Sequence, residues 1–364
     1  MSLNVRNVVS HNFVKLTLIF CLIPLLALIM SCKENEIPLG KIVTDTITSD
    51  ALKDNVLGDP NTRNMTIYLP PNYNSSKKRY PVIYLLHGYG GNNRSYVNAV
   101  GETGAILLLD GLIKTGILKE VIIVMPDGKT KYGGSYYQNS ELTGKYEDYI
   151  INEIVNYVDG KYRTIKDRSG RAIAGASMGG YGSITLAMKH SDAFVAVASL
   201  SPPLGLDIIS EAIIPQILKE NPNGMGGPIP DSKRKYTSYI YALSAVLSPN
   251  LINPPFLLDL PFEYPIGKAI ESIRQKWLIG DPMAMLSTYG SSFKNLSGNI
   301  YIDVGNEDLL GFTAAAYAFH DKLNNMGIEH KFNVYSGGHT DQVVARILDS
   351  LTFISMRLAN PSKS

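Results

Sequence analysis

The segment Gly175-Ala176-Ser177-Met178-Gly179 holds a serine between two glycines, in the spacing G-x-S-x-G. Residues 171–174 before it, Arg-Ala-Ile-Ala, are short and apolar enough for a buried strand, and residues 181–190 after it have the apolar character of a helix. A serine on a sharp strand-to-helix turn exposes its hydroxyl, and glycines allow the two backbones to approach closely. The segment therefore predicts a nucleophile elbow at Ser177, with the Met178 N–H placed to stabilise negative charge.

A nucleophilic serine needs a histidine as base and an acid that orients this histidine. The predicted folded part of the chain contains five histidines: His87, His190, His320, His330 and His339. His190 and His320 lie at the ends of predicted helices and His330 begins a predicted strand, so we expect all three at the surface. His339 follows two glycines in the loop between the last predicted strand and the last helix, where α/β-hydrolases place the base.

The acid of an α/β-hydrolase lies between the serine and the histidine in the sequence, in the loop that follows an earlier strand. The segment Gly305-Asn306-Glu307-Asp308 occupies such a loop. We predict Asp308 as the acid. Asp303, inside the preceding predicted strand, and Glu307, in the same loop, remain as alternatives.

A glycine-rich loop, residues 87–93, follows the predicted buried strand at 80–86. A phosphate-binding loop would require a G-K-[ST] sequence, which does not follow, whereas an oxyanion loop supplies a backbone N–H, here that of Tyr89. A glycine-rich turn without function is the alternative. We expect a structural role for His87, and we name it with the aromatic residues Tyr136 and Tyr137 as candidates for the substrate pocket.

Predicted strands and helices alternate along most of the chain. Strands are expected at 42–51, 64–69, 80–86, 121–125, 171–174, 194–200, 299–304 and 331–335, and helices at 104–114, 146–162, 181–190, 312–326 and 341–358. This alternation predicts an α/β fold with a mostly parallel central sheet and helices on both faces. Residues 204–298 interrupt it and are expected to form a cap-like insertion over the site, with a remote surface decoration as the alternative.

Five motifs carry a resemblance to a known family. They are Leu-Leu-His-Gly at 85–88, Met-Pro-Asp-Gly at 125–128, Gly-Ala-Ser-Met-Gly-Gly at 175–180, Gly-Asn-Glu-Asp at 305–308 and Gly-Gly-His at 337–339. Together they resemble the Putative esterase family of α/β-hydrolases, which includes esterase D, feruloyl and acetylxylan esterases and the mycolyltransferase antigens. The resemblance covers residues 42–203 and 275–358. It implies the α/β-hydrolase fold, a triad of Ser177, Asp308 and His339, and an oxyanion hole formed by the N–H groups of Tyr89 and Met178.

Composition excludes several other kinds of site. The chain has 364 residues, 18% of them charged, and a net charge of +2, so no basic surface for nucleic acid is implied. Both cysteines, Cys21 and Cys32, lie near the N-terminus, which leaves the folded part without a disulfide or a thiol nucleophile. The histidines lack the spacing of a zinc site. We expect a reaction that needs neither metal nor cofactor.

The N-terminus reads as a targeting segment. Arg6 and Lys15 precede an apolar run at 16–30 that ends at Ser31-Cys32, and residues 29–32 resemble a bacterial lipobox. We therefore predict a signal peptide at 1–31, lipidation of Cys32 and a membrane-anchored lipoprotein of the cell envelope. A plain signal peptide and an uncleaved anchor are the alternatives. A tether at 32–41, a hydrolase domain at 42–358 and a tail at 359–364 complete the predicted organisation.

These residues predict a serine esterase that forms an acyl-enzyme on Ser177. The expected substrate is a small-molecule or carbohydrate-linked ester. Two alternatives stay open: an acyltransferase that passes the acyl group to a sugar or another alcohol, and a non-catalytic surface binding protein that has this fold.

Overall fold

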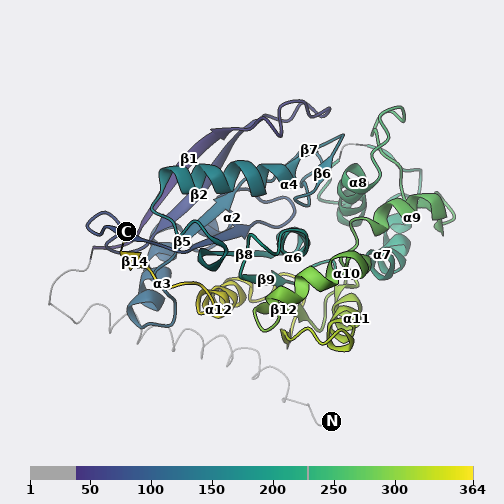
Figure 1. The fold of residues 1–364 in the computed structure, drawn as a ribbon. Helices are drawn as coiled ribbons and strands as arrows, with labels where there is room; N and C mark the ends of the chain where they lie inside the picture. Colours follow the sequence, from purple (N-terminus) through teal and green to yellow (C-terminus); the bar gives the residue numbers. More distant parts are fainter. Residues whose placement is uncertain (1–37, 228, 364) are drawn as a thin grey trace, which may run out of the picture. The chain divides into compact units, whose positions relative to one another are not determined.

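The computed structural model describes residues 38–227 and 229–363 (Figure 1). The predicted signal peptide and Cys32 lie outside these residues. Among the described helices, none is long and apolar enough to cross a membrane.

Eight strands form the central sheet. They are β1 (Lys41–Thr48), β2 (Thr62–Leu69), β4 (Val82–Leu86), β5 (Ile122–Pro126), β8 (Arg171–Ala176), β9 (Ala196–Leu200), β12 (Ile300–Gly305) and β13 (Lys331–Tyr335). Their order across the sheet is β1-β2-β5-β4-β8-β9-β12-β13. β2 runs antiparallel to β1 and β5, and the other neighbours are parallel. The predicted mostly parallel α/β sheet is confirmed.

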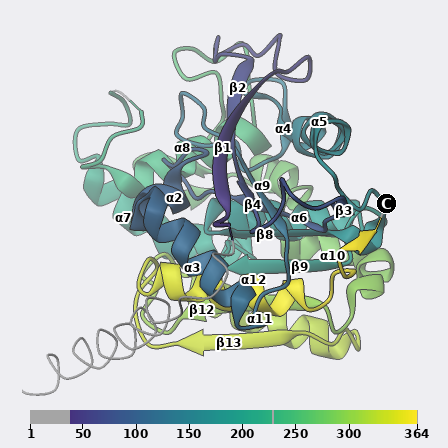
Figure 2. The ribbon, with the colours of Figure 1, turned by 90° about the vertical axis from the view of Figure 1, so that its left-hand side faces the viewer.

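Side chains of the central strands alternate between two hydrophobic cores, one on each face of the sheet. In β4, Val82, Tyr84 and Leu86 belong to one core, and Ile83 and Leu85 to the other. Helices α5 (Val155–Lys161), α6 (Met178–Lys189), α10 (Pro282–Phe293) and α11 (Phe312–Asn325) contribute to the first core, and α3 (Glu102–Lys114) and α12 (Val343–Ser355) to the second (Figure 2).

The shorter elements refine the predicted pattern. The helix expected at 146–162 consists of α4 (Tyr146–Asp148), a π-helical turn η1 (Tyr149–Ile154) and α5. The short helix α2 (Ser95–Val100) was not predicted. Strand β14 (Ser362–Lys363), within the predicted tail at 359–364, pairs with β3 (Lys78–Arg79). The remaining short elements are β6 (Asn139–Ser140), β7 (Gly144–Lys145), η2 (Arg168–Gly170) and η3 (Lys294–Leu296).

The segment between β9 and β12 is mainly helical. It comprises α7 (Leu206–Glu220), α8 (Lys235–Leu247), the hairpin β10 (Phe262–Glu263) and β11 (Lys268–Ala269), α9 (Glu271–Leu278) and α10. Helix α10 packs against α6 and so continues the central fold, whereas α7 packs against α8, α9 and α11. Asp281 connects the start of α7 with the start of α10. Its Oδ2 accepts the Leu206 N–H at 3.2 Å and its Oδ1 accepts the Met283 N–H at 2.9 Å, so it joins the two ends of the inserted part.

Candidate active site

Ser177 lies on the turn between β8 and α6, with φ 57° and ψ −118°. A positive φ is rare for a residue other than glycine and is maintained only where surrounding contacts hold it. Two backbone hydrogen bonds do so here: the Ser177 N–H donates to the Leu200 carbonyl at 2.7 Å, and the Tyr181 N–H donates to the Ser177 carbonyl at 2.9 Å. This conformation turns the chain sharply from strand to helix.

The two glycines of the motif are required by close backbone approach. A Cβ at Gly179 would lie 2.0 Å from the Leu86 carbonyl oxygen of the neighbouring strand β4. A Cβ at Gly175 would lie 2.4 Å from the carbonyl carbon of Gly179. Both distances are too short for any side chain, so the pairing of β4, β8 and the start of α6 is possible only with glycine at these positions.

Ser177, His339 and Asp308 form a continuous hydrogen-bonded series. Ser177 Oγ lies 2.8 Å from His339 Nε2, and His339 Nδ1 lies 2.7 Å from Asp308 Oδ2. The second carboxylate oxygen, Oδ1, accepts the Leu310 N–H at 3.0 Å. An imidazole with its proton on Nδ1 donates to the acid and leaves Nε2 free to accept the serine proton. The ring of Phe312 packs edge to face against the imidazole of His339, with the two ring centres 5.0 Å apart.

The predicted acid and the predicted base lie in loops that follow neighbouring parallel strands, β12 and β13. These loops are joined by backbone hydrogen bonds: the Asn306 N–H donates to the Tyr335 carbonyl at 3.0 Å and the Glu307 N–H to the Gly337 carbonyl at 3.0 Å. Gly337 has φ 137°, which suits glycine. Loops at the carboxyl ends of adjacent parallel strands meet at one sheet edge, which brings the three side chains together from distant parts of the sequence.

The two predicted oxyanion-hole donors, the N–H groups of Tyr89 and Met178, belong to segments that adjoin Ser177. Met178 is the first residue of α6, and the first N–H groups of a helix have no acceptor within the helix. The loop that contains Tyr89 runs against the elbow, since a Cβ built at Gly88 would lie 3.6 Å from Ser177 Cβ. In the part of the chain that the structure describes, neither the Tyr89 nor the Met178 N–H donates to a backbone or side-chain acceptor outside a helix.

A cavity of about 390 Å³, open solvent included, opens beside Ser177. Its walls come from the central fold and from α7 and α8, and the lining is Tyr89, Tyr136, Ser177, Met178, Pro203, Ile209, Ile213, Tyr239, Leu243, Leu310 and Phe312. The rings of Tyr89 and Tyr239 meet edge to face at 4.8 Å and join the loop after β4 to helix α8. Burial raises the pKa of Tyr89, Tyr136 and Tyr239 above the ordinary value, so the phenols stay neutral.

The sequence model of the family described as "Putative esterase" matches residues 60–343, which is more than half of the chain. The chain belongs to this esterase family. Esterase Rv1288 of Mycobacterium tuberculosis is 34% identical over 146 residues, which cover 39% of this chain and 29% of that protein. An endo-1,4-beta-xylanase/feruloyl esterase of Xylanibacter ruminicola is 34% identical over 135 residues, covering 35% and 18%. The matched segment thus spans less than a third of the length of either relative.

A solved ferulic acid esterase superposes on this chain with a TM-score of 0.59 at 25% identity, covering 88% of this chain and 99% of that chain. The fold of this esterase-family chain is therefore the α/β-hydrolase fold.

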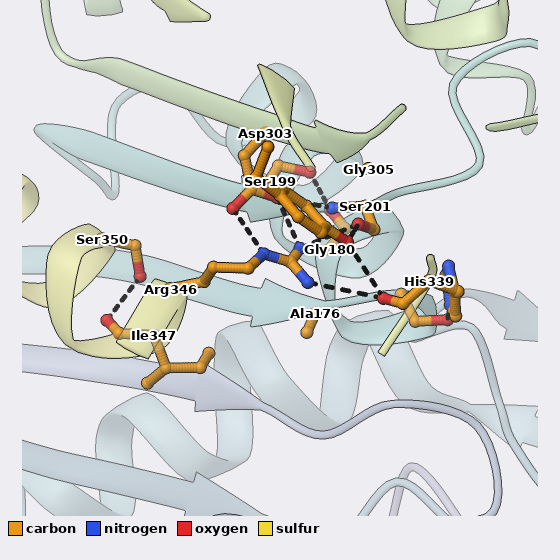
Figure 3. Close-up of polar contacts among 12 residues, drawn as sticks. Ala176, Gly180, Ser199, Ser201, Asp303, Gly305, His339, Arg346, Ile347 and Ser350 are labelled. Atoms are coloured by element: carbon orange, nitrogen blue, oxygen red, sulfur yellow. Dashed lines mark hydrogen bonds and ion pairs between the residues drawn. The ribbon is translucent and has the colours of Figure 1, made fainter. Parts of the chain in front are cut away.

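The two other acids considered from the sequence lie elsewhere. Asp303 is buried within β12 and hydrogen-bonds to Arg346 and to the Ser201 N–H (Figure 3). Glu307 is exposed. Of these three carboxylates, Asp308 is the one that hydrogen-bonds to His339.

The pocket candidates separate into two groups. Tyr136 lines the cavity, whereas His87 and Tyr137 are buried beneath it and are absent from its lining. His87 Nδ1 lies 2.8 Å from the Gly88 carbonyl, its Nε2 accepts the Gly128 N–H at 2.8 Å, and the Tyr137 hydroxyl donates to the His87 carbonyl at 3.0 Å. Both side chains therefore hold the loop that carries Tyr89 instead of facing a substrate, which corrects the predicted pocket.

Most of the apolar lining was not named from the sequence. Ile209 and Ile213 of α7, and Tyr239 and Leu243 of α8, lie four residues apart on one helix face and reach the cavity in pairs. Leu310 follows the predicted acid by two positions, a proximity that could have indicated it. Within the described residues, no three His, Cys, Asp or Glu side chains gather as metal ligands would.

Proposed function

We propose that this chain is an exported serine esterase that hydrolyses carboxylic esters through an acyl-enzyme on Ser177. The observation that carries the proposal is the hydrogen-bonded series from Ser177 Oγ through His339 to the buried carboxylate of Asp308. Membership of an esterase family supports it. Binding alone would require no nucleophile, base and acid in this order.

In the proposed mechanism, Ser177 Oγ attacks the ester carbonyl carbon while His339 Nε2 takes the hydroxyl proton. The carbonyl oxygen becomes an oxyanion, which the N–H groups of Tyr89 and Met178 stabilise; loss of one such donor typically costs about a hundredfold or more. His339 then protonates the departing alcohol. Water, deprotonated by the same imidazole, attacks the acyl-enzyme and releases the acid. Asp308 keeps the imidazole in the required tautomer and stabilises its cation.

The cavity favours an uncharged acyl group. None of the described residues that line it carries a charged side chain, and most are aliphatic or aromatic. Apolar walls with few polar groups are usual for small-molecule pockets. One relative is named a feruloyl esterase, and a feruloyl ester has an uncharged aromatic acyl group; we propose a small-molecule or carbohydrate-linked ester as the substrate class.

The experiment that tests this proposal compares wild type with Ser177→Ala on aryl esters with acyl groups from acetyl to long chains, and on a feruloyl ester. We expect Ser177→Ala to lose at least about ten-thousandfold in turnover and all labelling by a fluorophosphonate probe. Ser183→Ala is the control, because this serine lies on the same helix but donates to the Gly180 and Ala198 carbonyls. Wild-type turnover or labelling in Ser177→Ala would place the nucleophile elsewhere.

The proposed export and lipid anchoring rest on the sequence alone. The charged start, the apolar run and the lipobox-like residues 29–32 support a signal peptide followed by lipidation of Cys32. An anchored esterase would meet ester substrates at the cell envelope, in keeping with its lack of a nucleic-acid-binding charge pattern.

A further inference from the structure

A buried ion pair lies beneath the loop that carries His339. Arg346 of α12 donates from Nε to Asp303 Oδ2 at 2.9 Å and from Nη2 to Asp303 Oδ1 at 2.6 Å, a two-pronged contact (Figure 3). The side chains are 5% and 0% exposed. Burial raises the pKa of Asp303, and Arg346 opposes that effect. A buried pair of this kind is weak evidence for stability, because apolar residues of similar size often stabilise a core equally well.

The guanidinium also reaches the backbone of the histidine loop. Its Nη1 donates to the Asp341 carbonyl at 3.2 Å and to the His339 carbonyl at 3.4 Å, and its Nη2 donates to Ser201 Oγ at 2.8 Å. These contacts use the planar fork of arginine, which a lysine ammonium cannot reproduce. Arg346 therefore connects the carboxylate of β12 with the carbonyl of His339 itself.

Tyr335 holds the same loop from a second side. Its hydroxyl donates to the Gly338 carbonyl at 2.8 Å and lies 3.3 Å from the His339 carbonyl. The Arg346 guanidinium stacks 3.9 Å from the centre of its ring. Two buried side chains thus fix the backbone immediately before and at His339.

The same pair is tied to the strand that supports the nucleophile. The Ser201 N–H donates to Asp303 Oδ1 at 3.0 Å, and the preceding residue, Leu200, accepts the Ser177 N–H at 2.7 Å. The hydrogen bonds of Asp303 and Arg346 therefore connect the strand that holds the Ser177 backbone with the backbone of His339.

We propose that Arg346, oriented by Asp303, is a positioning residue that sets the distance between His339 and Ser177. This inference rests on the proposed role of His339 as the base. Displacement of a catalytic group by about 1 Å can cost on the order of a hundredfold in rate. Arg346 does not touch the substrate cavity, so its effect falls on turnover and leaves substrate binding unchanged.

The test uses Arg346→Lys in the full chain. Lysine keeps a cation beside Asp303 but loses the contacts to the loop carbonyls. We expect kcat per folded molecule to fall about ten- to a hundredfold with KM within about twofold. Tyr335→Phe is the second variant, because it preserves the ion pair and the stacked ring and removes only the hydroxyl; we expect a loss of about tenfold in kcat.

Tyr68→Phe is the matched control, since it removes a buried tyrosine hydroxyl that donates to Asp110 at 2.6 Å on another part of the sheet. It should lower the melting temperature without changing kcat. If both loop variants lower the melting temperature but keep wild-type kcat, the pair is only structural and the inference is overturned.

A spectroscopic readout separates this inference from the proposed function. The His339 Nδ1 proton, shared with Asp308, should give a low-field ¹H resonance in histidine-labelled protein. We expect Arg346→Lys to shift or broaden it. If wild-type protein is inactive and unlabelled by fluorophosphonate but this resonance responds, the proposed function fails and the positioning stands. If wild type is active and neither the resonance nor kcat responds, the positioning fails and the esterase proposal stands.

Discussion

The carboxylate of Asp308 accepts a hydrogen bond from His339 Nδ1 at 2.7 Å, and its side chain is inaccessible to solvent. Its other oxygen accepts the Leu310 N–H at 3.0 Å, so the carboxylate is held at both ends. In the proposed mechanism, a buried, fixed acid at this distance selects the tautomer with the proton on Nδ1 and favours the imidazolium that forms during proton transfer. Asp303, five residues earlier, is held by Arg346 and cannot serve the same histidine.

The first prediction ranks these two acids. Asp308→Asn should lower kcat about ten-thousandfold, because the amide favours the wrong imidazole tautomer, as it does in serine proteases. Asp303→Asn should lower kcat only about tenfold, through loosening of the histidine loop, and should also lower the melting temperature. Steady-state kinetics on folded, purified variants measure both effects. A larger loss of kcat in Asp303→Asn than in Asp308→Asn would identify Asp303 as the acid.

Ser177 and His339 could be predicted from the sequence as nucleophile and base because their signals are local. Ser177 has its glycines and its strand and helix within a few residues, and His339 lies beside the glycines of its own loop. The choice of acid depends on contacts that are distant in the sequence. Asp303 is inside β12, and its partner Arg346 lies 43 residues later, so only the folded chain shows that its carboxylate is occupied.

The pocket was harder to predict for the same reason. His87, expected to be structural but also named as a pocket candidate, is buried, and its Nε2 accepts the N–H of Gly128, 41 residues later. Helix α8 carries apolar residues on several faces, since Tyr239, Ile240 and Tyr241 are consecutive, so periodicity could not show which face meets the cavity. The place of His87 and the face of α8 that meets the cavity both depend on contacts between residues far apart in the sequence.

The second prediction concerns the helices of the insertion. Ile213→Ala and Leu243→Ala should widen the cavity beside Ser177 and raise kcat/KM for a butyryl ester relative to an acetyl ester about tenfold, the usual scale for one or two methylene groups. Ile217→Ala is the control on α7, because it is equally buried but absent from the lining. It should destabilise the fold by about 2–5 kcal/mol and leave the acyl preference unchanged. An unchanged butyryl-to-acetyl ratio in both pocket variants would show that α7 and α8 do not form the acyl wall.

The third prediction concerns membrane attachment. Cys32→Ala should release the protein from the membrane fraction or block its processing, because the proposed lipid chains attach only through that thiol and contribute about 0.8 kcal/mol per buried methylene. Fractionation of cells that express wild type or variant, with metabolic labelling by a fatty-acid analogue, measures it. Cys21→Ala, in the predicted signal peptide, should behave as wild type. Normal labelling and fractionation of Cys32→Ala would exclude lipidation at this residue.

The fourth prediction follows from Asp281, which ties the two ends of the insertion. Burial raises the pKa of this carboxyl from 3.8 to about 6 in the folded protein. The folded state therefore keeps a proton that the unfolded state releases between about pH 4 and pH 6. The contribution of Asp281 to stability is fully present below about pH 4 and is lost as the pH rises through about 6.

Asp281→Asn removes this titration and keeps an acceptor for the Met283 N–H. The free energy of unfolding of the variant, relative to wild type, should therefore be lower at pH 5 than at pH 7.5. We expect this relative value to change by about 1 kcal/mol between the two pH values. Denaturant unfolding of both proteins at the two pH values measures it. Asp167→Asn is the control, because the hydrogen bond from Ser169 lowers the pKa of Asp167 from 3.8, so its contribution is lost only as the pH falls below about 4 and should not differ between pH 5 and pH 7.5. If the free energies of unfolding of wild type and Asp281→Asn differ by the same amount at both pH values, Asp281 does not titrate in this range. Its burial then does not make the stability of the insertion depend on pH.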